Sequence, residues 1–233
     1  MDTSDARGSV AVLRSDAIVS AGAHESTEDY SSWLLPAVDS ALREAGIRMA
    51  DVDGYAVSTG PGSFTGVRVG LTTVKAWAEV YGKPIVAVSR LEAIAGQGPG
   101  AGPLVAAFAS ASRGQVFGAV YRRNGAGLER LGEEMDLAPG KFVAAAAELA
   151  GGETISWAST DPDCVVGVDA WQAREKLKER IELVSPFLAE TMARMAASRV
   201  PEGPCVDALT LDANYVRRPD AEMLWKGGKA HGG

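Results

Sequence analysis

The stretch 58–75 holds the residue types that most resemble a ligand-binding loop. Gly60-Pro61-Gly62 is a turn signal that follows a short apolar run at 55–57, and a helical spacing of apolar residues begins at Val67. A strand, a glycine-rich turn and a helix can hold a phosphate against free amide donors. The stretch nevertheless lacks both the Gly-Lys-Ser/Thr of a Walker A loop and the Gly-x-Ser-x-Gly of a hydrolase elbow. Neither generic motif applies.

Side chains suited to catalysis are scarce. The two histidines are His24, expected to be a solvated loop residue with a base or metal ligand as the alternative, and His231 in a glycine-rich tail. The acidic pairs in 51–53 and 133–134 are expected to be solvated turn charges. Asp2, Thr3 and Ser4 form the one acidic loop that resembles nucleotide-handling chemistry, so they are weak candidates for cofactor binding. We expect no catalytic residue and no metal site.

Composition narrows the class of protein. A formal net charge of -7 argues against direct nucleic-acid binding, which needs clustered Lys and Arg. No apolar run approaches the ~18 residues of a membrane span, and no charged-then-apolar leader opens the chain, so we expect a cytoplasmic protein. Cys164 and Cys205 are too few for a disulfide framework and are expected to be buried free thiols.

The helix after the loop carries an unusual glycine pattern. Gly62, Gly66 and Gly70 recur every four residues and would share one face, which Thr73 and Trp77 continue. Each interior glycine costs roughly 0.5–1 kcal/mol relative to alanine, so the pattern needs a reason. Either the helix packs closely on its own sheet, or another helix approaches this face.

The remaining pattern predicts an α/β protein of two lobes. Residues 1–98 would form the first lobe, 99–222 the second and 223–233 a flexible tail, with the Gly- and Pro-rich segment 96–103 as the boundary. A helix should start at a Ser-x-x-Asp sequence at 26–29, with Leu34 in its core stripe and Tyr30, Trp33 and Ala37 beside that stripe. Trp33 is either a core edge or an interface anchor. The further predicted strands are 9–13, 17–19, 85–88, 104–108, 114–121 and 165–168, and the further helices are 89–95, 142–150, 170–181 and 185–198.

The segment Gly60-Pro61-Gly62-Ser63-Phe64-Thr65-Gly66-Val67-Arg68-Val69-Gly70 resembles the signature of the TsaB (YeaZ) family, the dimerisation subunit of the bacterial tRNA threonylcarbamoyladenosine machinery. Other blocks match in the same order. They are Met1-Asp2-Thr3-Ser4, Leu34-Leu35-Pro36, the strand and cap at 83–89, the Arg-Gly-Gln-Val-Phe block at 113–117 and the C-terminal block at 213–218.

This resemblance implies an actin-like ATPase (ASKHA, ribonuclease H-like) fold of two lobes that has lost its own catalytic and metal residues. Family members begin with a strand of about five residues before the Asp-Thr-Ser. That strand is missing here, so either the start codon lies upstream or the strand is lost. Tyr30 replaces a histidine common among relatives, which argues further against metal binding. Ser110 stands where the family pattern has an aspartate, so the role of that aspartate is not carried over to this chain.

The resemblance also implies partners. TsaB pairs through its first two helices with TsaD, the catalytic paralogue, which transfers a threonylcarbamoyl group to N6 of adenosine 37 in tRNAs that read ANN codons. TsaE, an ATPase, joins the complex, and tRNA is contacted only indirectly. No cofactor is expected on this chain alone, with ATP or ADP allowed in the assembled complex. The expected partner interface comprises Tyr30, Trp33, Leu34, Ala37, Gly62, Phe64, Gly66, Val69, Gly70, Thr73 and Trp77.

Two other functions stay open on the sequence. One is a stand-alone ATP-binding ASKHA phosphotransferase or hydrolase that uses Asp2 and the Gly60 loop. The other is a homodimeric regulator that acts without a larger partner. Calorimetry with ATP-Mg and light scattering would distinguish them.

Overall fold

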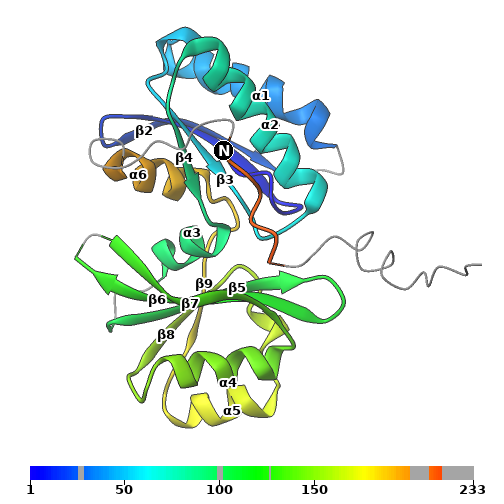
Figure 1. The fold of residues 1–233 in the computed structure, drawn as a ribbon, viewed down its shortest axis with the longest axis vertical. Helices are drawn as coiled ribbons and strands as arrows, with labels where there is room; N and C mark the ends of the chain where they lie inside the picture. The colour runs from blue at the N-terminus through cyan, green and yellow to red at the C-terminus, as the bar shows by residue number, and fades with distance from the viewer. Residues whose placement is uncertain (26–28, 99–101, 126, 200–209, 217–233) are drawn as a thin grey trace, which may run out of the picture.

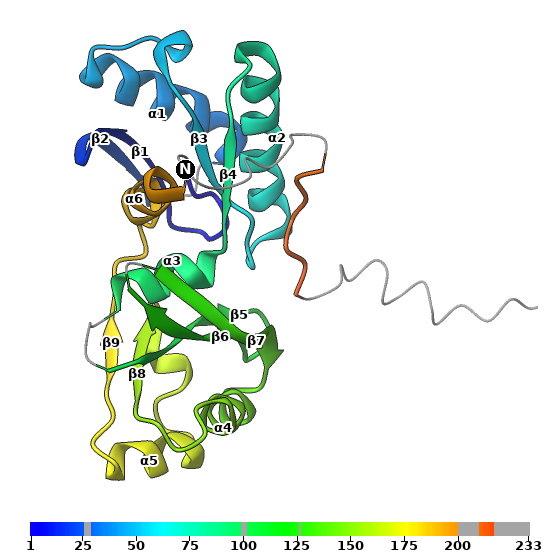
Figure 2. The same cartoon turned by 60° about the vertical axis from the view of Figure 1, so that its left-hand side comes forward.

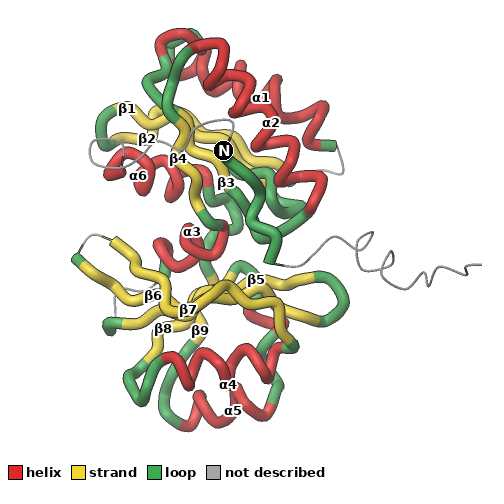
Figure 3. The backbone as a smooth tube through the Cα atoms, viewed as in Figure 1, coloured by secondary structure: helices red, strands yellow, loops and turns green. Residues whose placement is uncertain are grey.

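A computed structural model describes residues 1–25, 29–98, 102–125, 127–199 and 210–216, which form two stacked lobes (Figure 1, Figure 3). The upper lobe contains β1 (Gly8–Arg14), β2 (Ala17–His24), α1 (Tyr30–Ala45), a 3-10 turn (Met49–Asp51), β3 (Tyr55–Ser58), α2 (Phe64–Tyr81), β4 (Ile85–Val88) and α6 (Ala189–Arg199). Below it lie α3 (Arg90–Gln97), β5 (Leu104–Ala111), β6 (Gln115–Asn124), β7 (Gly127–Leu137), α4 (Pro139–Leu149), β8 (Ile155–Ser159), a 3-10 turn (Pro162–Cys164), α5 (Asp169–Lys176) and β9 (Ile181–Leu183).

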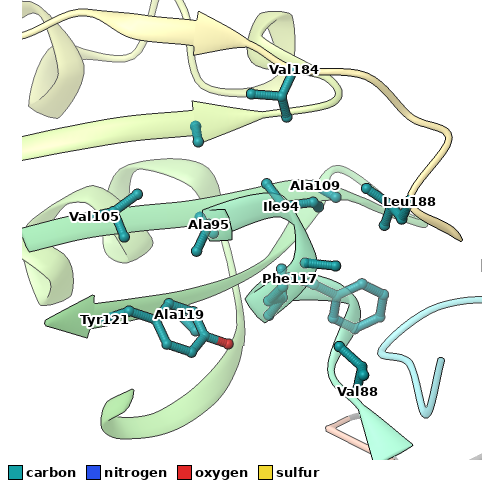
Figure 4. Packing of buried hydrophobic residues seen from close by; sticks show 14 of the residues in the cluster. Val88, Ile94, Ala95, Val105, Ala109, Phe117, Ala119, Tyr121, Val184 and Leu188 are labelled. Carbon is teal, nitrogen blue, oxygen red and sulfur yellow. The ribbon is translucent and has the colours of Figure 1, made fainter. Parts of the chain in front are cut away.

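The lower lobe is built on one five-stranded sheet of order β7-β6-β5-β8-β9. Its central strand β5 reads Leu-Val-Ala-Ala-Phe-Ala-Ser-Ala, an almost unbroken apolar run because both faces are covered. Phe108 and Trp157 pack against Phe142 of α4, and all three are fully buried. On the other face, α3 contributes Ile94 and Ala95 to a second core (Figure 4). This sheet is therefore packed on both sides.

The upper lobe has a divided sheet. Strands β1 and β2 pair antiparallel, β3 and β4 pair parallel, and the two pairs share no ladder within the described residues. Only Met1 and Asp2 connect them. The Met1 nitrogen donates to the Ala56 carbonyl (2.7 Å), while Asp2 and Ser9 exchange backbone hydrogen bonds of 2.8 and 2.9 Å. Met1 and Asp2 thus lie between the two strand pairs of the divided sheet.

Helices cover both faces of the divided sheet. Helices α1 and α2 lie side by side on one face, and α6 lies on the other (Figure 2). The Ser63 hydroxyl caps α2 by accepting from the Gly66 amide (3.2 Å), and Gly46 and Gly82 end α1 and α2 with left-handed φ values of 67° and 64°. Because α6 packs on β1, β3 and β4, residues 189–199 belong to the upper lobe. The predicted boundary, which assigned all of 99–222 to the second lobe, is wrong for this helix.

Several predicted elements differ from the observed ones. Residues 165–168, expected as a strand, form a turn after the second 3-10 segment, and the expected helix over 170–181 ends at Lys176. Strand β7 was not expected because it pairs only with β6 at the sheet edge, so its sequence is charged rather than apolar. The predicted helix start at 26–29 falls almost wholly outside the described residues, and the tail 223–233 falls entirely outside them.

Candidate interaction surface on α1 and α2

An open groove of about 550 Å³ runs between α1 and α2 in the upper lobe. Leu35 and Phe64 are the exposed large apolar residues at its edges, at 55% and 40% exposure. Arg68 supplies the one charge among the residues that line it. The others are Tyr30, Ser31, Leu34, Thr65, Val69, Thr72 and Thr73. The groove is therefore an apolar surface edged with hydroxyl groups.

The two sides of α2 have different roles. Phe64, Arg68 and Thr72 recur every four residues and line the groove. The glycines are offset from these positions by two residues, which is about 200° around a helix. They consequently face inward, where a Cβ on Gly66 would lie 2.1 Å from the Thr3 carbonyl oxygen and one on Gly70 would lie 2.5 Å from Thr3 Oγ1.

This inward placement corrects the prediction that the glycines receive a partner helix. A Cβ on Gly62 would lie only 1.9 Å from the Ser4 carbonyl oxygen, so all three glycines are covered by the N-terminal segment of the same chain. Close packing within the chain, the other alternative, is what the structure shows. The tightest contacts are made with Thr3 and Ser4, and Gly70 also faces Val57 of β3 at 3.5 Å.

The other predicted interface residues divide between surface and core. Tyr30, Leu34, Phe64, Val69 and Thr73 meet at the groove, with Leu34 at its floor and only 1% exposed. Half-buried Trp33 and Ala37 pack against the apolar cluster under α1.

Trp77, by contrast, is directed away from the groove. Its ring lies 5.9 Å from that of Tyr55, next to β3. The sequence interpretation also missed Leu35, Arg68 and Thr72, although the four-residue spacing of Phe64, Arg68 and Thr72 was a readable signal for a shared face.

The C-terminal block is anchored at one end of the groove. The Arg68 guanidinium carbon lies 3.8 Å from the centroid of the Phe64 ring, and Arg68 Nε donates to the Tyr215 hydroxyl at 2.9 Å. The Phe64 and Tyr215 rings lie 5.5 Å apart. These contacts combine cation–π attraction with a charge-assisted hydrogen bond. They hold the guanidinium of Arg68, the charged group of the groove, in one position.

His24 lies in an aromatic cluster below the groove. Its ring centroid is 4.6 Å from that of Tyr30 and 4.9 Å from that of Trp33, and the residue is 3% exposed. The expectation of a solvated loop histidine is therefore wrong. The Tyr30 hydroxyl donates to the Asp5 carbonyl at 2.5 Å, and burial raises the pKa of Tyr30. This cluster supports the start of α1 on the end of β2.

A second cavity, of about 430 Å³, lies between the two lobes, with Gly62, Arg90 and Arg113 among its lining residues. Of the three weak nucleotide candidates, Ser4 alone lines it. The Asp2 carboxylate is fully buried and accepts from the Ser4 amide and hydroxyl at 2.9 and 2.6 Å, while the Thr3 hydroxyl donates to the Gly66 carbonyl at 2.7 Å. Asp2 and Thr3 thus hold the N-terminal segment against α2.

The loop at 60–63 is also engaged internally. The Ser63 amide donates to the Ser4 carbonyl at 2.7 Å, and the Gly60 carbonyl accepts from the Arg90 amide at 2.8 Å. Arg90 itself, 3% exposed, donates to the Asp5 carboxylate at 2.5 Å. The Ser63 amide, in the loop that resembles a phosphate-binding loop, and the Arg90 guanidinium of the cavity are therefore already paired within the chain.

Glu134 connects the lobes and corrects a further prediction. Its carboxylate accepts from the Ser89 hydroxyl at 2.5 Å and from the Asn214 side-chain amide at 2.6 Å, and its side chain is 3% exposed. It is therefore not a solvated turn charge, and burial raises its pKa. Through this carboxylate, strand β7 holds both the cap of α3 and the C-terminal block.

Other sequence expectations concern metal, thiol and membrane chemistry. Over the described ranges, no three His, Cys, Asp or Glu side chains gather where they could hold a metal ion. Cys164 is a half-buried free thiol, and burial raises its pKa to about 11, while Cys205 lies outside the described residues. None of the helices in the described part of the chain has the length and apolar character to span a membrane.

Comparison with known proteins identifies relatives of this chain. The family model "TsaD: tRNA N6-adenosine threonylcarbamoyltransferase" matches residues 24–165. The tRNA threonylcarbamoyladenosine biosynthesis protein TsaB of Bacillus subtilis is 34% identical over 131 residues, which cover 56% of this chain and 57% of that protein. A tRNA N6-adenosine threonylcarbamoyltransferase of Bradyrhizobium is 55% identical over 56 residues, or 24% of this chain and 16% of that enzyme. The matches thus span little over half of the first relative and under a fifth of the second.

Solved structures agree along nearly the whole chain. YeaZ from Pseudomonas aeruginosa superposes with a TM-score of 0.72 at 25% identity and covers 92% of this chain and 96% of its own. An uncharacterized Pseudomonas aeruginosa protein described as similar to peptidase YeaZ gives 0.71 at 26% identity, with 93% and 97% coverage. The fold is therefore the expected two-lobed actin-like one. The chain belongs to the TsaB (YeaZ) family, within the wider group that the TsaD family model describes.

Proposed function

We propose that this chain is a non-catalytic subunit in the formation of N6-threonylcarbamoyladenosine at position 37 of tRNAs that read ANN codons. Its role is to bind and support a TsaD-like catalytic subunit through the groove between α1 and α2. The observation that carries this proposal is the exposure of Leu35 and Phe64 at 55% and 40% on either side of one groove. Exposed apolar residues that flank one groove, one of them aromatic, are typical of a protein interface.

The placement of the reactive side chains supports a non-catalytic role. Asp2 is enclosed behind Ser4, and His24 is packed between aromatic rings away from the cavity between the lobes. A peptidase activity, suggested by the description of one structural neighbour, would need a serine next to a reachable histidine. Among the described residues the single histidine is enclosed, which disfavours that activity.

The other partners follow from the same proposal. A TsaE-like ATPase joins the assembly, and ATP or ADP is bound by the assembled complex rather than by this chain alone. The net charge of -7 favours indirect contact with tRNA, with the phosphates held by another subunit. The proposal places the chain in the cytoplasm, where tRNA is modified.

Co-elution with the TsaD-like protein of the same organism tests the interface. Phe64→Glu places a charge in the apolar groove and should abolish co-elution, because an unpaired charge is costly to bury. Val80→Glu is the matched control, since Val80 lies on the same helix, is 74% exposed and does not line the groove. The control should bind like the wild type. Equal binding by both variants would contradict the interface, provided that circular dichroism shows both to be folded.

The cavity between the lobes keeps one competing function open. Its lining includes Arg90 and Arg113, which suit an anionic ligand. Calorimetry of the isolated chain with ATP-Mg should show no tight binding if the chain is a scaffold. Tight binding would favour the stand-alone phosphotransferase or hydrolase. A homodimer formed through the same groove is separable by light scattering, because Phe64→Glu would then convert a dimer into a monomer without any partner present.

A further inference from the structure

A short strap, residues 211–216, crosses between the two lobes beside the start of α2 (Figure 2). Leu211 at one end of the strap is buried in the core of the upper lobe. Val216 at the other end packs against the core that α3 shares with the lower sheet. The strap, all of which the structure describes, contains no helix or strand. Its position therefore depends on the contacts of individual side chains and amides.

Asn214 attaches the strap to both lobes. Its backbone amide donates to the Thr59 carbonyl of the upper lobe at 2.8 Å. Its side-chain amide donates to the Glu134 carboxylate of β7, in the lower lobe, at 2.6 Å. The Glu134 side chain is buried, and it also accepts from the Ser89 hydroxyl at 2.5 Å. Hydrogen bonds to a carboxylate are the stronger kind, so the contact between Asn214 and Glu134 is a firm attachment to the lower lobe.

Tyr215, the next residue, carries the strap to the groove between α1 and α2. Its hydroxyl accepts from Arg68 Nε at 2.9 Å, and its ring lies 5.5 Å from the Phe64 ring. Arg68 and Phe64 both line the groove, whereas Tyr215 does not. The two Nη groups of Arg68 donate to none of the described residues. An arginine fork held in this way suits a carboxylate on a partner.

We propose that Glu134 and Asn214 are positioning residues for the groove, although neither of them lines it. They act through Tyr215, which holds the Phe64 ring and the Arg68 guanidinium in the arrangement that the partner contacts. Loss of the contact between Glu134 and Asn214 would release the strap, and both groove side chains would then have to be ordered during binding, at a cost in affinity. This inference rests on the proposed function, because it takes the groove as the site of the partner.

Asn214→Asp tests the attachment, because two neighbouring carboxylates resist being ionised together. Asn124→Asp is the matched control, since Asn124 is the other asparagine of the chain and is exposed at the end of β6. Titration with the TsaD-like protein of the same organism measures the affinity. At pH 8 we expect Asn214→Asp to bind about tenfold more weakly than the control. At pH 6 the difference should shrink to about threefold or less, because a proton shared by the two carboxylates restores a hydrogen bond.

The groups around Glu134 are the same in both variants. Arg130 of β7 and the Tyr121 hydroxyl of β6 each lie 3.5 Å from its carboxylate, and Glu92 of α3 acts on Tyr121. The ratio of the two affinities at each pH therefore reports the carboxylate introduced at position 214. A ratio of one at both pH values would contradict the positioning role.

Tyr215→Phe tests the route from Asn214 to the groove. It keeps the ring and removes the hydroxyl that Arg68 contacts, so binding should weaken by about threefold. If Asn214 acts through Tyr215, the double variant should bind no more weakly than Asn214→Asp alone. Fully additive losses, about thirtyfold in total, would contradict this route.

Phe64→Glu separates failure of this inference from failure of the proposed function. If Phe64→Glu binds the partner like the wild type, the proposed function fails. If it abolishes binding while Asn214→Asp binds like its control, the positioning role alone is overturned. Hydrogen exchange in the isolated chain gives a reading without a partner. Protection of the amide at position 214 should fall by about tenfold in Asn214→Asp, and unchanged protection would contradict the attachment of the strap through Glu134.

Discussion

The two lobes build their sheets in different ways. The lower sheet is continuous over five strands and encloses Phe108, Phe142 and Trp157 without exposure. The upper sheet consists of two strand pairs joined through Met1 and Asp2, and its cores are smaller. Stability should therefore be concentrated in the lower lobe. The upper lobe carries the groove between α1 and α2, and its sheet is the divided one.

Two buried carboxylates show the same contrast. In the lower lobe, Glu179 accepts from Trp157 Nε1 and from Arg174 Nε at 2.7 Å each, and it also accepts from the Ile155 amide. In the upper lobe, Asp2 Oδ1 is paired with Ser4, but Asp2 Oδ2 has no hydrogen-bond partner. A buried acceptor without a partner costs free energy. Of these two carboxylates, the one with an unpaired oxygen therefore belongs to the lobe whose sheet is divided.

Truncating one tryptophan in each lobe should give the largest difference in stability between the lobes. Trp157→Ala removes a fully buried ring and the partner of Glu179, so we expect it to lower the free energy of unfolding by about 3–5 kcal/mol. Trp77→Ala removes a half-buried ring that lies 5.9 Å from the Tyr55 ring, and we expect a loss of about 1–2 kcal/mol. Urea denaturation of both variants measures the difference. A larger loss for Trp77→Ala would contradict the assignment of stability to the lower lobe.

The glycine face of α2 gives the next largest effect. Gly66→Ala would place a Cβ 2.1 Å from the Thr3 carbonyl oxygen and displace the N-terminal segment, at a cost of about 1–3 kcal/mol. Gly140→Ala in α4 is the control, because no atom lies within 4 Å of the added Cβ and alanine favours a helix. It should be neutral or slightly stabilising in thermal unfolding. Equal effects would show that Thr3 does not pack on this face.

The pH dependence of stability gives the smallest effect. Desolvation lowers the pKa of the Met1 ammonium from 8.0 to about 6 in the folded chain. Between these values the unfolded chain holds the proton and the folded chain does not, so stability should rise with pH by about 1–2 kcal/mol. Urea titrations at pH 6 and pH 8 measure this rise. It should be absent from a chain with Gly-Ser before Met1, and its persistence there would assign the effect to another group.

Much of the fold was predictable because the decisive signals are local. The apolar stripe of α2, which begins at Val67, follows from spacing within one helix. Strand β7 was not predictable in this way, because an edge strand with Glu and Arg along it lacks the apolar alternation of a central strand. The return of α6 to the upper lobe depends on tertiary packing, which periodicity does not describe.

The candidate site was only partly predictable for a related reason. The sequence shows that Gly62, Gly66 and Gly70 share a face, but it does not show what that face contacts. The structure places Thr3 and Ser4 against that face. Gly70, predicted as an interface residue, is therefore covered, whereas Leu35 and Arg68 line the groove. A bulky charge at Gly70 would disturb the fold itself, whereas one at Phe64 tests the surface alone.

The most direct test of the central claim is the content of N6-threonylcarbamoyladenosine in bulk tRNA after depletion of this protein. We expect a marked loss of the modified nucleoside, restored by the wild-type chain and by Val80→Glu but not by Phe64→Glu. An unchanged content of the nucleoside after depletion would contradict the assignment to this modification.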